Sequence, residues 1–400
     1  MNKALFIVIL LLLSFSFSEG KENKRIIRIA LYDSISPSVN LIEKACHYGW
    51  IADKNYEMEV ERIGYKEVME GLSSYDVLVI GASGRQYFHG LNPKWRENVK
   101  KFIANGGGYV GICGGANIMS KGYEKPRHPL DFIITKSALE IVDAYINDDQ
   151  CGEWQYLWKE GVADEPPRGN IPIKNEIVAN HPIFAGMKER YITYGGGPGL
   201  YGMKNAKGLA VYTEEPMDVA PLHYWIWLGK WIPYKKIRTD IKGYYSCAEA
   251  KYGKGKVIIF GGHPEIPPSF NASIVEYFGL SIYNIPRFVY AWKGGEQKNY
   301  SYNWWILRRS IAYVCNLPLP PAEELYVELG INGNQIEAYA ENAEKVEFYV
   351  EGELYFIDSE PPFKFNFDLQ GKHVIKAIAY SSNAYAWDEK EVENDNMRKI

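Results

Sequence analysis

The chain has 400 residues, of which 46% are hydrophobic and 24% are charged, so it is long enough for two or three compact domains with buried cores. The formal net charge of -4 gives no sign of a basic surface, and we expect no nucleic-acid partner. The charge is uneven, because residues 322–400 contain 17 acidic and 7 basic side chains while the remainder is mildly basic. This asymmetry indicates two different modules.

The first residues have the pattern of an export signal. Lys3 precedes an unbroken apolar run at residues 4–13, and small residues follow. This order predicts a signal peptide at residues 1–18, cleaved after Ser18, and therefore a secreted or extracytoplasmic protein. The apolar run is shorter than the ~20 residues that span a bilayer. If Ser14 to Phe17 are counted as well, the length of the segment comes closer to the length that spans a bilayer. A membrane anchor formed by an uncleaved signal is therefore the alternative.

Five cysteines follow that segment: Cys46, Cys113, Cys151, Cys247 and Cys315. None of them forms a C-x-x-C pair, so we expect neither a zinc ribbon nor a redox dithiol. An odd count leaves at least one thiol unpaired in an exported protein. If Cys113 is that thiol, the other four can form two disulfides in any of three pairings, and the sequence leaves the choice open.

Strand signals alternate with helix signals in the first third of the chain. Short apolar runs predict strands at residues 25–32, 56–64, 76–84 and 109–112. Prolines and glycines at the ends of amphipathic segments predict helices at residues 36–50, 65–75, 92–108 and 114–122. This alternation predicts an α/β fold of the flavodoxin-like type, with a mostly parallel sheet that is covered by helices on both faces.

The middle of the chain is less regular. We expect strands at 138–146 and 207–212, a glycine-rich loop at 191–202, a β-hairpin at 243–265 and a closing helix at 299–317. The stretch from Pro221 to Arg238 is rich in aromatic residues, among them Trp225, Trp227 and Trp231. It predicts either a lid or sugar-stacking platform, or an insertion that packs on the sheet.

The apolar period changes to two near the end of the chain. Residues 345–382 alternate apolar and polar side chains between turns, which predicts a small antiparallel β-sandwich with core strands at 346–350 and 374–379. This stretch resembles the bacterial immunoglobulin-like domains that are appended to extracellular enzymes, which implies a spacer or attachment role. The predicted organisation is a signal peptide at 1–18, an α/β domain at 24–318, a proline-rich linker at 319–322 and the sandwich at 323–395.

Cys113 lies where a predicted strand ends and a helix begins, between Gly111 and Gly115. A nucleophile on a sharp strand-to-helix turn needs small neighbours, and the helix N-terminus favours its thiolate form. The alternative is an inert, buried cysteine in a glycine-rich turn. His263 and Glu265 follow another apolar strand, at the edge where open α/β sheets build their sites. Cysteine, histidine and glutamate then suit the roles of nucleophile, base and orienting group.

Four motifs in this order carry a resemblance to a known family: GGGYVGICGGA, HPIFAGM, YGGGP and YGKGKVIIFGGHPE. Over roughly residues 25–317 the chain resembles the class I glutamine amidotransferase-like superfamily, and within it the biotin-protein ligase N-terminal-domain type. The resemblance implies Cys113 as nucleophile, His263 as base and Glu265 as the partner of His263. It also implies a glutamine amidotransferase-like fold for this part of the chain.

The resemblance further implies an oxyanion hole made by Gly114 and the loop after the third strand. Relatives carry a proline-glycine-glycine turn in that loop, whereas this chain has Gly81-Ala82-Ser83-Gly84. Ser83 and Gly84 are therefore the candidate donors, and the identity of the donor stays open. A second candidate region is the glycine-rich loop, which is expected either to contact substrate or to be a structural turn. Its candidate residues are Tyr194, Gly196 and Gly197.

We find neither the lysine-containing catalytic domain nor the adenylate-binding loop of a biotin ligase, so biotin ligation is not expected. The leading interpretation is an exported cysteine hydrolase or amidase that cleaves an amide, γ-glutamyl or peptide bond in a small molecule or peptide. The alternatives are a non-catalytic protein that binds glycan or peptide, and a protease that is active only as an oligomer. The other histidines lack metal-ligand spacing, and we expect no metal and no cofactor. The sandwich and the aromatic insertion are the candidate contacts with a cell surface or glycan.

Overall fold

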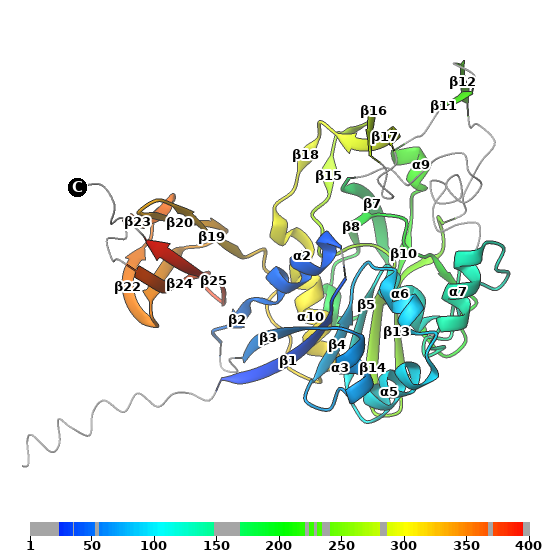
Figure 1. Cartoon of the computed structure of the whole chain (residues 1–400), viewed down its shortest axis with the longest axis horizontal. Coiled ribbons are helices and arrows are strands. Elements are labelled where there is room, and N and C mark those ends of the chain that lie inside the picture. Colours follow the sequence, from blue (N-terminus) through cyan, green and yellow to red (C-terminus); the bar gives the residue numbers. More distant parts are fainter. Residues whose placement is uncertain are drawn as a thin grey trace, which may run out of the picture.

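The computed structural model describes residues 24–34, 36–52, 56–147, 169–220, 224–227, 230–233, 241–280, 286–366 and 371–394 (Figure 1). The predicted signal peptide and Cys151 lie outside the described residues. Of the aromatic insertion, the structure describes an antiparallel hairpin of β11 (Tyr224–Trp227) and β12 (Lys230–Pro233). No helix within the described ranges is long and apolar enough to cross a bilayer.

One large sheet organises the first part of the protein. Five of its strands are parallel, in the order β3 (Tyr56–Ile63), β1 (Arg25–Tyr32), β4 (Val77–Ile80), β5 (Gly108–Ile112) and β14 (Gly255–Phe260). Four antiparallel strands continue it, in the order β13 (Tyr245–Tyr252), β10 (Lys207–Tyr212), β7 (Ile171–Ile177) and β8 (Glu189–Tyr194). The two short strands β6 (Tyr145–Ile146) and β9 (Leu200–Tyr201) branch from β13.

The sheet is therefore mixed rather than mostly parallel as the alternation predicted. The change of direction occurs at the predicted hairpin, where β13 and β14 are joined by a tight turn with Tyr252 opposite Gly255. A turn of this length can join only antiparallel strands, because a parallel pair needs a long crossover connection. All residues of β4 and β5 are buried, as expected for strands covered on both faces.

Helices cover both faces of the parallel half, which confirms that part of the prediction. On one face lie α3 (Tyr65–Glu70), α5 (Pro93–Ala104) and α6 (Gly114–Met119), and on the other lie α2 (Pro37–Cys46) and α10 (Trp304–Val314) (Figure 1). Each face has its own hydrophobic cluster. The helix α2 begins where predicted, because Ser36 caps its N-terminus and Pro37 occupies its first turn.

Two predictions about local structure were wrong. The helix predicted at 36–50 ends at Cys46, and the next residues form the short strand β2 (Tyr48–Trp50). The strand predicted at 138–146 is a loop except for β6, since its apolar side chains are buried against α6 while its amides bond to the end of that helix. The sequence left open whether disulfides form, and all four described cysteines, Cys46, Cys113, Cys247 and Cys315, are free thiols.

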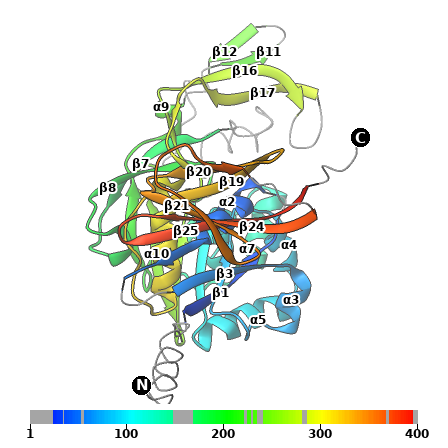
Figure 2. The same ribbon diagram turned by 90° about the vertical axis from the view of Figure 1, so that its left-hand side faces the viewer.

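Two antiparallel sheets form the C-terminal part around one hydrophobic core (Figure 2). One sheet has the order β19 (Tyr326–Asn332), β20 (Gln335–Glu341) and β23 (Phe363–Asn366). The other has the order β2, β25 (Ala384–Asn394), β24 (Gly371–Tyr380), β21 (Lys345–Val350) and β22 (Glu353–Asp358). The core strands predicted at 346–350 and 374–379 are confirmed as β21 and β24.

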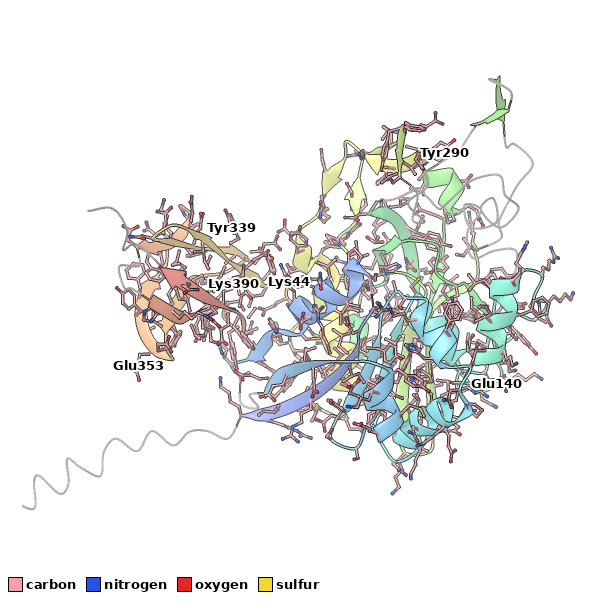
Figure 3. All side chains as sticks on the ribbon, viewed as in Figure 1. Lys44, Glu140, Tyr290, Tyr339, Glu353 and Lys390 are labelled. Atoms are coloured by element: carbon pink, nitrogen blue, oxygen red, sulfur yellow. The ribbon has the colours of Figure 1, made fainter. Side chains whose placement is uncertain are left out.

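The two parts of the chain share a sheet and an extensive polar junction. The strand β2 comes from the first part but pairs with β25, with Tyr48 opposite Ala386. Lys44 of α2 forms an ion pair with Glu328 at 2.6 Å, and Figure 3 places Lys44 at the boundary between the two parts, with Glu353 at the far end of the C-terminal sheets. Arg308 of α10 is buried and donates to the carbonyls of Ala45 (2.6 Å) and Leu325 (3.1 Å).

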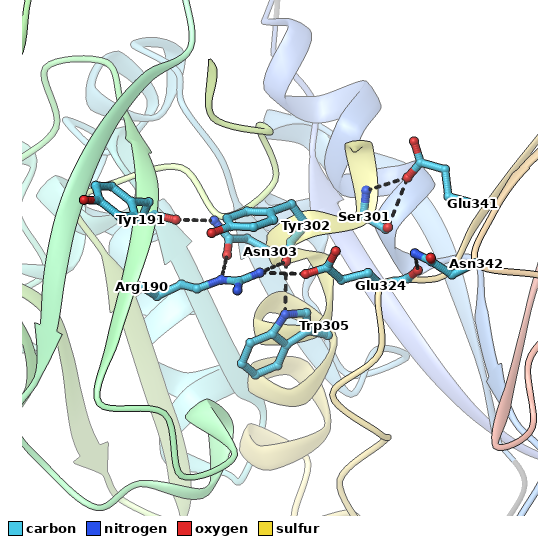
Figure 4. A network of polar contacts seen from close by, with 9 residues as sticks. All are labelled: Arg190, Tyr191, Ser301, Tyr302, Asn303, Trp305, Glu324, Glu341 and Asn342. Atoms are coloured by element: carbon cyan, nitrogen blue, oxygen red, sulfur yellow. Dashed lines mark hydrogen bonds and ion pairs between the residues drawn. The ribbon is translucent and has the colours of Figure 1, made fainter. Parts of the chain in front are cut away.

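A second polar network joins β8, α10 and the chain entering the C-terminal sheets (Figure 4). Arg190 donates to Asn303 Oδ1 at 2.9 Å and to Glu324 Oε1 at 2.9 Å, and its guanidinium lies 3.6 Å from the centre of the Tyr302 ring. On the same side Glu341 accepts a hydrogen bond from the Ser301 hydroxyl at 3.1 Å. These contacts fix how the C-terminal sheets dock on the first part.

Candidate functional site

Cys113 occupies a strained turn at the carboxyl end of β5. Its backbone has φ 53° and ψ -104°, in the region that residues with a side chain rarely adopt, and α6 begins at the next residue. The turn is tight enough to require glycine at position 115, where an added Cβ would lie 1.9 Å from the Ile80 carbonyl oxygen. This is the geometry of a side chain presented on a strand-to-helix elbow.

Backbone hydrogen bonds hold this strained residue on both sides. The Cys113 amide donates to the Phe260 carbonyl of β14 at 2.8 Å. Its carbonyl accepts from the amides of Ala116 (2.9 Å) and Asn117 (3.0 Å) in α6. The neighbouring strand and the first turn of the helix therefore over-determine the conformation, which is what allows the strain to persist.

His263 lies beside Cys113 because the strand that precedes it, β14, is the parallel neighbour of β5. The His263 amide donates to the Thr193 carbonyl at 2.8 Å, so the end of β8 also fixes its position. The His263 side chain is only 6% exposed. Burial lowers the pKa of His263, but the charge of Glu265 and the charge and hydrogen bond of Cys113 outweigh it and raise that pKa well above its ordinary value.

Glu265 is fully buried and faces the other side of the imidazole. The Nδ1–H group of His263 donates to Glu265 Oε1 at 2.8 Å, which directs Nε2 toward the cysteine side. The same Oε1 accepts a hydrogen bond from the Ser38 hydroxyl at 2.6 Å, and Trp304 Nε1 donates to the Glu265 carbonyl at 2.8 Å. Glu265 Oε2 has no hydrogen-bond partner among the described residues.

Ser38 is the site residue that the sequence analysis missed. It lies in the first turn of α2, 227 positions before Glu265. A serine near the start of a predicted helix is an ordinary capping pattern, so the sequence carries no signal for this contact. Only the docking of α2 beside β4 brings the two residues together.

The loop after β4 faces the first turn of α6. An added Cβ on Gly114 would lie 2.3 Å from the Ser83 carbonyl oxygen and 2.6 Å from Gln86 Nε2, so the two segments touch at Gly114. Gln86 Nε2 donates to the Ser83 carbonyl at 2.5 Å, and Gly84 caps the short helix α4 (Arg85–His89). Amides in the first turn of a helix have no intrahelical acceptor, so those of Gly114 and Gly115 can serve a ligand beside Cys113.

The glycine-rich loop after β8 closes over the cysteine and the histidine. An added Cβ on Gly197 would lie 1.7 Å from the Gly261 carbonyl oxygen and 3.5 Å from Cys113 Cα, and one on Gly195 would lie 3.2 Å from His263 Nε2. Gly196 has φ 84°. Tyr194 is buried, and its hydroxyl donates to the Gly197 carbonyl at 3.1 Å. The backbone of this loop thus lies at the site, while the Tyr194 side chain supports the loop from the core.

The remaining candidates lie away from this site. His181 serves as a cap, since its Nδ1 accepts from the Ile183 amide at 3.4 Å and its Nε2 lies 3.5 Å from Glu249 Oε2. Nowhere in the described ranges do three or more His, Cys, Asp or Glu side chains gather in a way that would hold a metal ion. The side chains of Trp225, Trp227 and Trp231 lie outside the described residues.

Comparison with known families assigns the chain. Residues 72–277 match the family described as "Biotin-protein ligase, N terminal", which is more than half of the chain. The protein belongs to the biotin-protein ligase N-terminal family. This confirms the resemblance seen in the four ordered motifs. A comparison with curated proteins found no match.

Several solved structures are similar to parts of this family member. PurLQS from Thermotoga maritima shares 11% identity over 60% of this chain and 88% of that one, with a TM-score of 0.34. A β-galactosidase from Bacillus circulans sp. alkalophilus shares 10% identity over 92% of this chain and 41% of that one, with a TM-score of 0.38. The fibronectin(III)-like modules of Clostridium thermocellum CbhA share 29% identity over 17% of this chain and 93% of that one, with a TM-score of 0.16.

Proposed function

We propose that the protein is an exported cysteine-dependent hydrolase or amidase that cleaves an amide, γ-glutamyl or peptide bond. The observation that carries the proposal is the alignment of three side chains at one edge of the sheet. Cys113 is presented on a strained elbow at the end of β5, His263 follows the neighbouring parallel strand β14, and Glu265 Oε1 lies 2.8 Å from Nδ1 of the imidazole. Nucleophile, base and orienting group in this order are the requirement for covalent acyl transfer.

In the proposed first step, the Cys113 thiolate attacks the carbonyl carbon and a C–S bond forms. The electron pair of the carbonyl moves to its oxygen, which lies against the amide of Gly114 and an amide of the Ser83–Gly84 loop. The imidazolium of His263 then gives its proton to the leaving nitrogen as the C–N bond breaks. The products are a free amine or ammonia and a thioester on Cys113.

In the second step, His263 removes a proton from a water molecule, whose oxygen attacks the thioester carbonyl. The C–S bond breaks, the acid leaves, and the thiolate–imidazolium pair is restored. The charge of Glu265 favours the imidazolium that acts in the first step and is formed again in the second. The raised pKa of His263 supports the same assignment, because it favours the imidazolium that gives its proton to the leaving nitrogen.

We propose that the C-terminal sheets are an immunoglobulin-like sandwich that spaces the hydrolase or attaches it to a cell surface or glycan. Their two antiparallel layers around one core and their acidic composition support this role. Export rests on the N-terminal sequence pattern alone. It is tested by expressing the full chain in a bacterium and determining the N-terminus of the protein outside the cytoplasm, for which a start close to residue 19 is expected.

The test of the activity compares the full chain with its Cys113→Ala and Cys315→Ala variants. L-glutamine and γ-glutamyl-p-nitroanilide are the first substrates, followed by a peptide library, with release of ammonia, p-nitroaniline or new amino termini as readout. Cys113→Ala should lose at least about 1,000-fold in turnover while keeping its circular dichroism spectrum. Cys315→Ala should retain full activity. Equal activity of the wild type and Cys113→Ala on every cleaved substrate would refute the proposal.

A non-catalytic binding role is the second candidate, and one observation favours it. The His263 imidazole is almost fully covered, and the glycine-rich loop packs directly on it. In that case Cys113 should react with iodoacetamide no faster than a free thiol of ordinary pKa, and no amide substrate should be cleaved.

A further inference from the structure

The hydroxyl of Ser38 stands between the two halves of the proposed site. Its side chain belongs to a residue that is 2% exposed, in the first turn of α2. It donates to Glu265 Oε1 at 2.6 Å and accepts from the Ala82 amide at 3.4 Å. A hydroxyl has one proton to donate and two lone pairs, so it makes both bonds at once.

The hydrogen bond from Ser38 to Glu265 involves the same carboxylate oxygen that contacts His263. A fully buried carboxylate is costly unless hydrogen bonds compensate its lost hydration. Oε1 receives two such bonds, from His263 Nδ1–H and from the Ser38 hydroxyl, whereas Oε2 receives none from the described residues. Ser38 is therefore the only partner other than the imidazole recorded for this carboxylate in the described part of the chain. Its hydrogen bond fixes the rotation of the carboxylate group.

The bond to Ala82 bears on the other half of the site. Ala82 follows Gly81 at the end of β4, and the next two residues are the candidate oxyanion donors Ser83 and Gly84. The start of α2 approaches this turn closely, since an added Cβ on Gly81 would lie 2.9 Å from Ser38 Oγ and 2.8 Å from Ile42 Cδ1. The glycine thus makes room for the hydroxyl to reach both Glu265 and the loop.

We propose that Ser38 is a positioning residue of this site. Its hydroxyl bonds to both Glu265 and the loop after β4, and so keeps the His263 imidazole and the oxyanion donors in a fixed position relative to each other. The proposal rests on the proposed function. Ser38 does not touch the reacting atoms; it acts on them through Glu265 and through the Ala82 amide. The titratable groups that act on the His263 imidazole are Glu265 and Cys113. A substitution of Ser38 therefore affects His263 through Glu265.

The experiment measures the rate at which iodoacetamide alkylates Cys113 between pH 5 and pH 9, which needs no knowledge of the substrate. The full chain with Cys315→Ala serves as the background. Ser38→Ala should slow alkylation at neutral pH by about 10-fold, the loss expected for one hydrogen bond to a buried charge, and should move the midpoint of the pH profile upward. Ser38→Thr keeps the hydroxyl and should recover most of the rate.

The matched control is Ser310→Ala, which removes another buried serine hydroxyl that bonds only to the Ile306 carbonyl within α10. Its alkylation profile should equal that of the background. A double-mutant cycle then tests the route of the effect: in a Glu265→Gln background, Ser38→Ala should change the rate by less than about 2-fold. Circular dichroism of each variant verifies that the fold is retained.

Two results would overturn the inference while leaving the proposed function intact. One is an unchanged profile in Ser38→Ala, and the other is the same 10-fold loss in the Glu265→Gln background, which would mean that Ser38 does not act through Glu265. If Cys113 in the background protein reacts no faster than free glutathione, the proposed function fails and this inference fails with it. If Ser38→Ala unfolds, Ser38→Thr decides: a Ser38→Thr protein that folds but still loses about 10-fold in rate, while Ser310→Ala stays at the background rate, would refute the role of the hydroxyl.

Discussion

Cys113 and Cys315 are two partly buried thiols at opposite edges of the same sheet. Cys113 follows the carboxyl end of β5, in a strained turn, with an imidazole against it. Cys315 ends α10 beside the start of β4, where its thiol lies 3.9 Å from the Asp76 carbonyl oxygen. Burial raises the pKa of Cys315 to about 12. The surroundings, rather than the thiol itself, therefore separate a candidate nucleophile from an inert side chain.

The cavity beside Cys315, at the amino-terminal ends of the parallel strands, shows that a cavity next to a cysteine is not enough to make an active site. Cys315 lines a cavity of about 510 Å³ together with Asp76, Lys101 and Phe102. None of the described residues that line this cavity is a histidine, and burial there favours the neutral form of the thiol. At the carboxyl edge, by contrast, the histidine and the buried glutamate arrive on a neighbouring strand. Parallel strands bring their carboxyl ends to one edge, which is why complementary groups collect there.

The largest expected effect is the difference in reactivity between these two cysteines. At pH 7 and under native conditions, iodoacetamide should alkylate Cys113 about 1,000-fold faster than Cys315, because only the thiolate reacts. Peptide mapping by mass spectrometry after timed quenching measures both rates in one sample. Denatured protein is the control, in which the two rates should converge. Comparable alkylation rates of the two cysteines in the native protein would contradict the claim that only Cys113 is activated.

A second prediction concerns the tight turn that presents Cys113. Gly115→Ala should lower the free energy of unfolding by about 2–3 kcal/mol, because its new Cβ would meet the Ile80 carbonyl oxygen at 1.9 Å. Gly84→Ala is the matched substitution in the facing loop, where an added Cβ meets nothing within 4 Å and φ is -106°, so its stability should be nearly unchanged. Urea unfolding at pH 7 measures both variants. Equal stabilities would show that the elbow is not constrained as described.

The smallest expected effect is a dependence of stability on pH that belongs to His263. Its pKa is higher in the folded protein than in the unfolded chain, so the protonated imidazole stabilises the fold. This contribution is fully present below about pH 6.5, the ordinary histidine pKa, and is lost as the pH rises through the folded pKa. The stability difference between wild type and His263→Gln should therefore shrink from pH 6 toward pH 10. A difference that grows in that range would mean that the imidazole is buried in its neutral form.

Much of the first part of the fold could be predicted from local patterns. The strands β1, β3, β4 and β5 and the helices between them follow from apolar runs, capping residues and glycine stops, all of which act within a few residues. The strand expected at 138–146 failed because its apolar side chains pack on α6, a choice that periodicity alone cannot make. The strand β2 was missed because its partner β25 is more than 300 residues away in the sequence.

The candidate site divides in the same way. Short contiguous motifs were enough to predict the residue types at two strand ends, the small residues around Cys113 and the family. Tertiary structure alone decided that Ser38 reaches Glu265, that the Tyr194 side chain turns into the core, and that α2 and α10 connect this edge to the C-terminal sheets. Those contacts depend on how distant elements dock, and a buried hydrogen bond between distant residues leaves no local pattern along the chain.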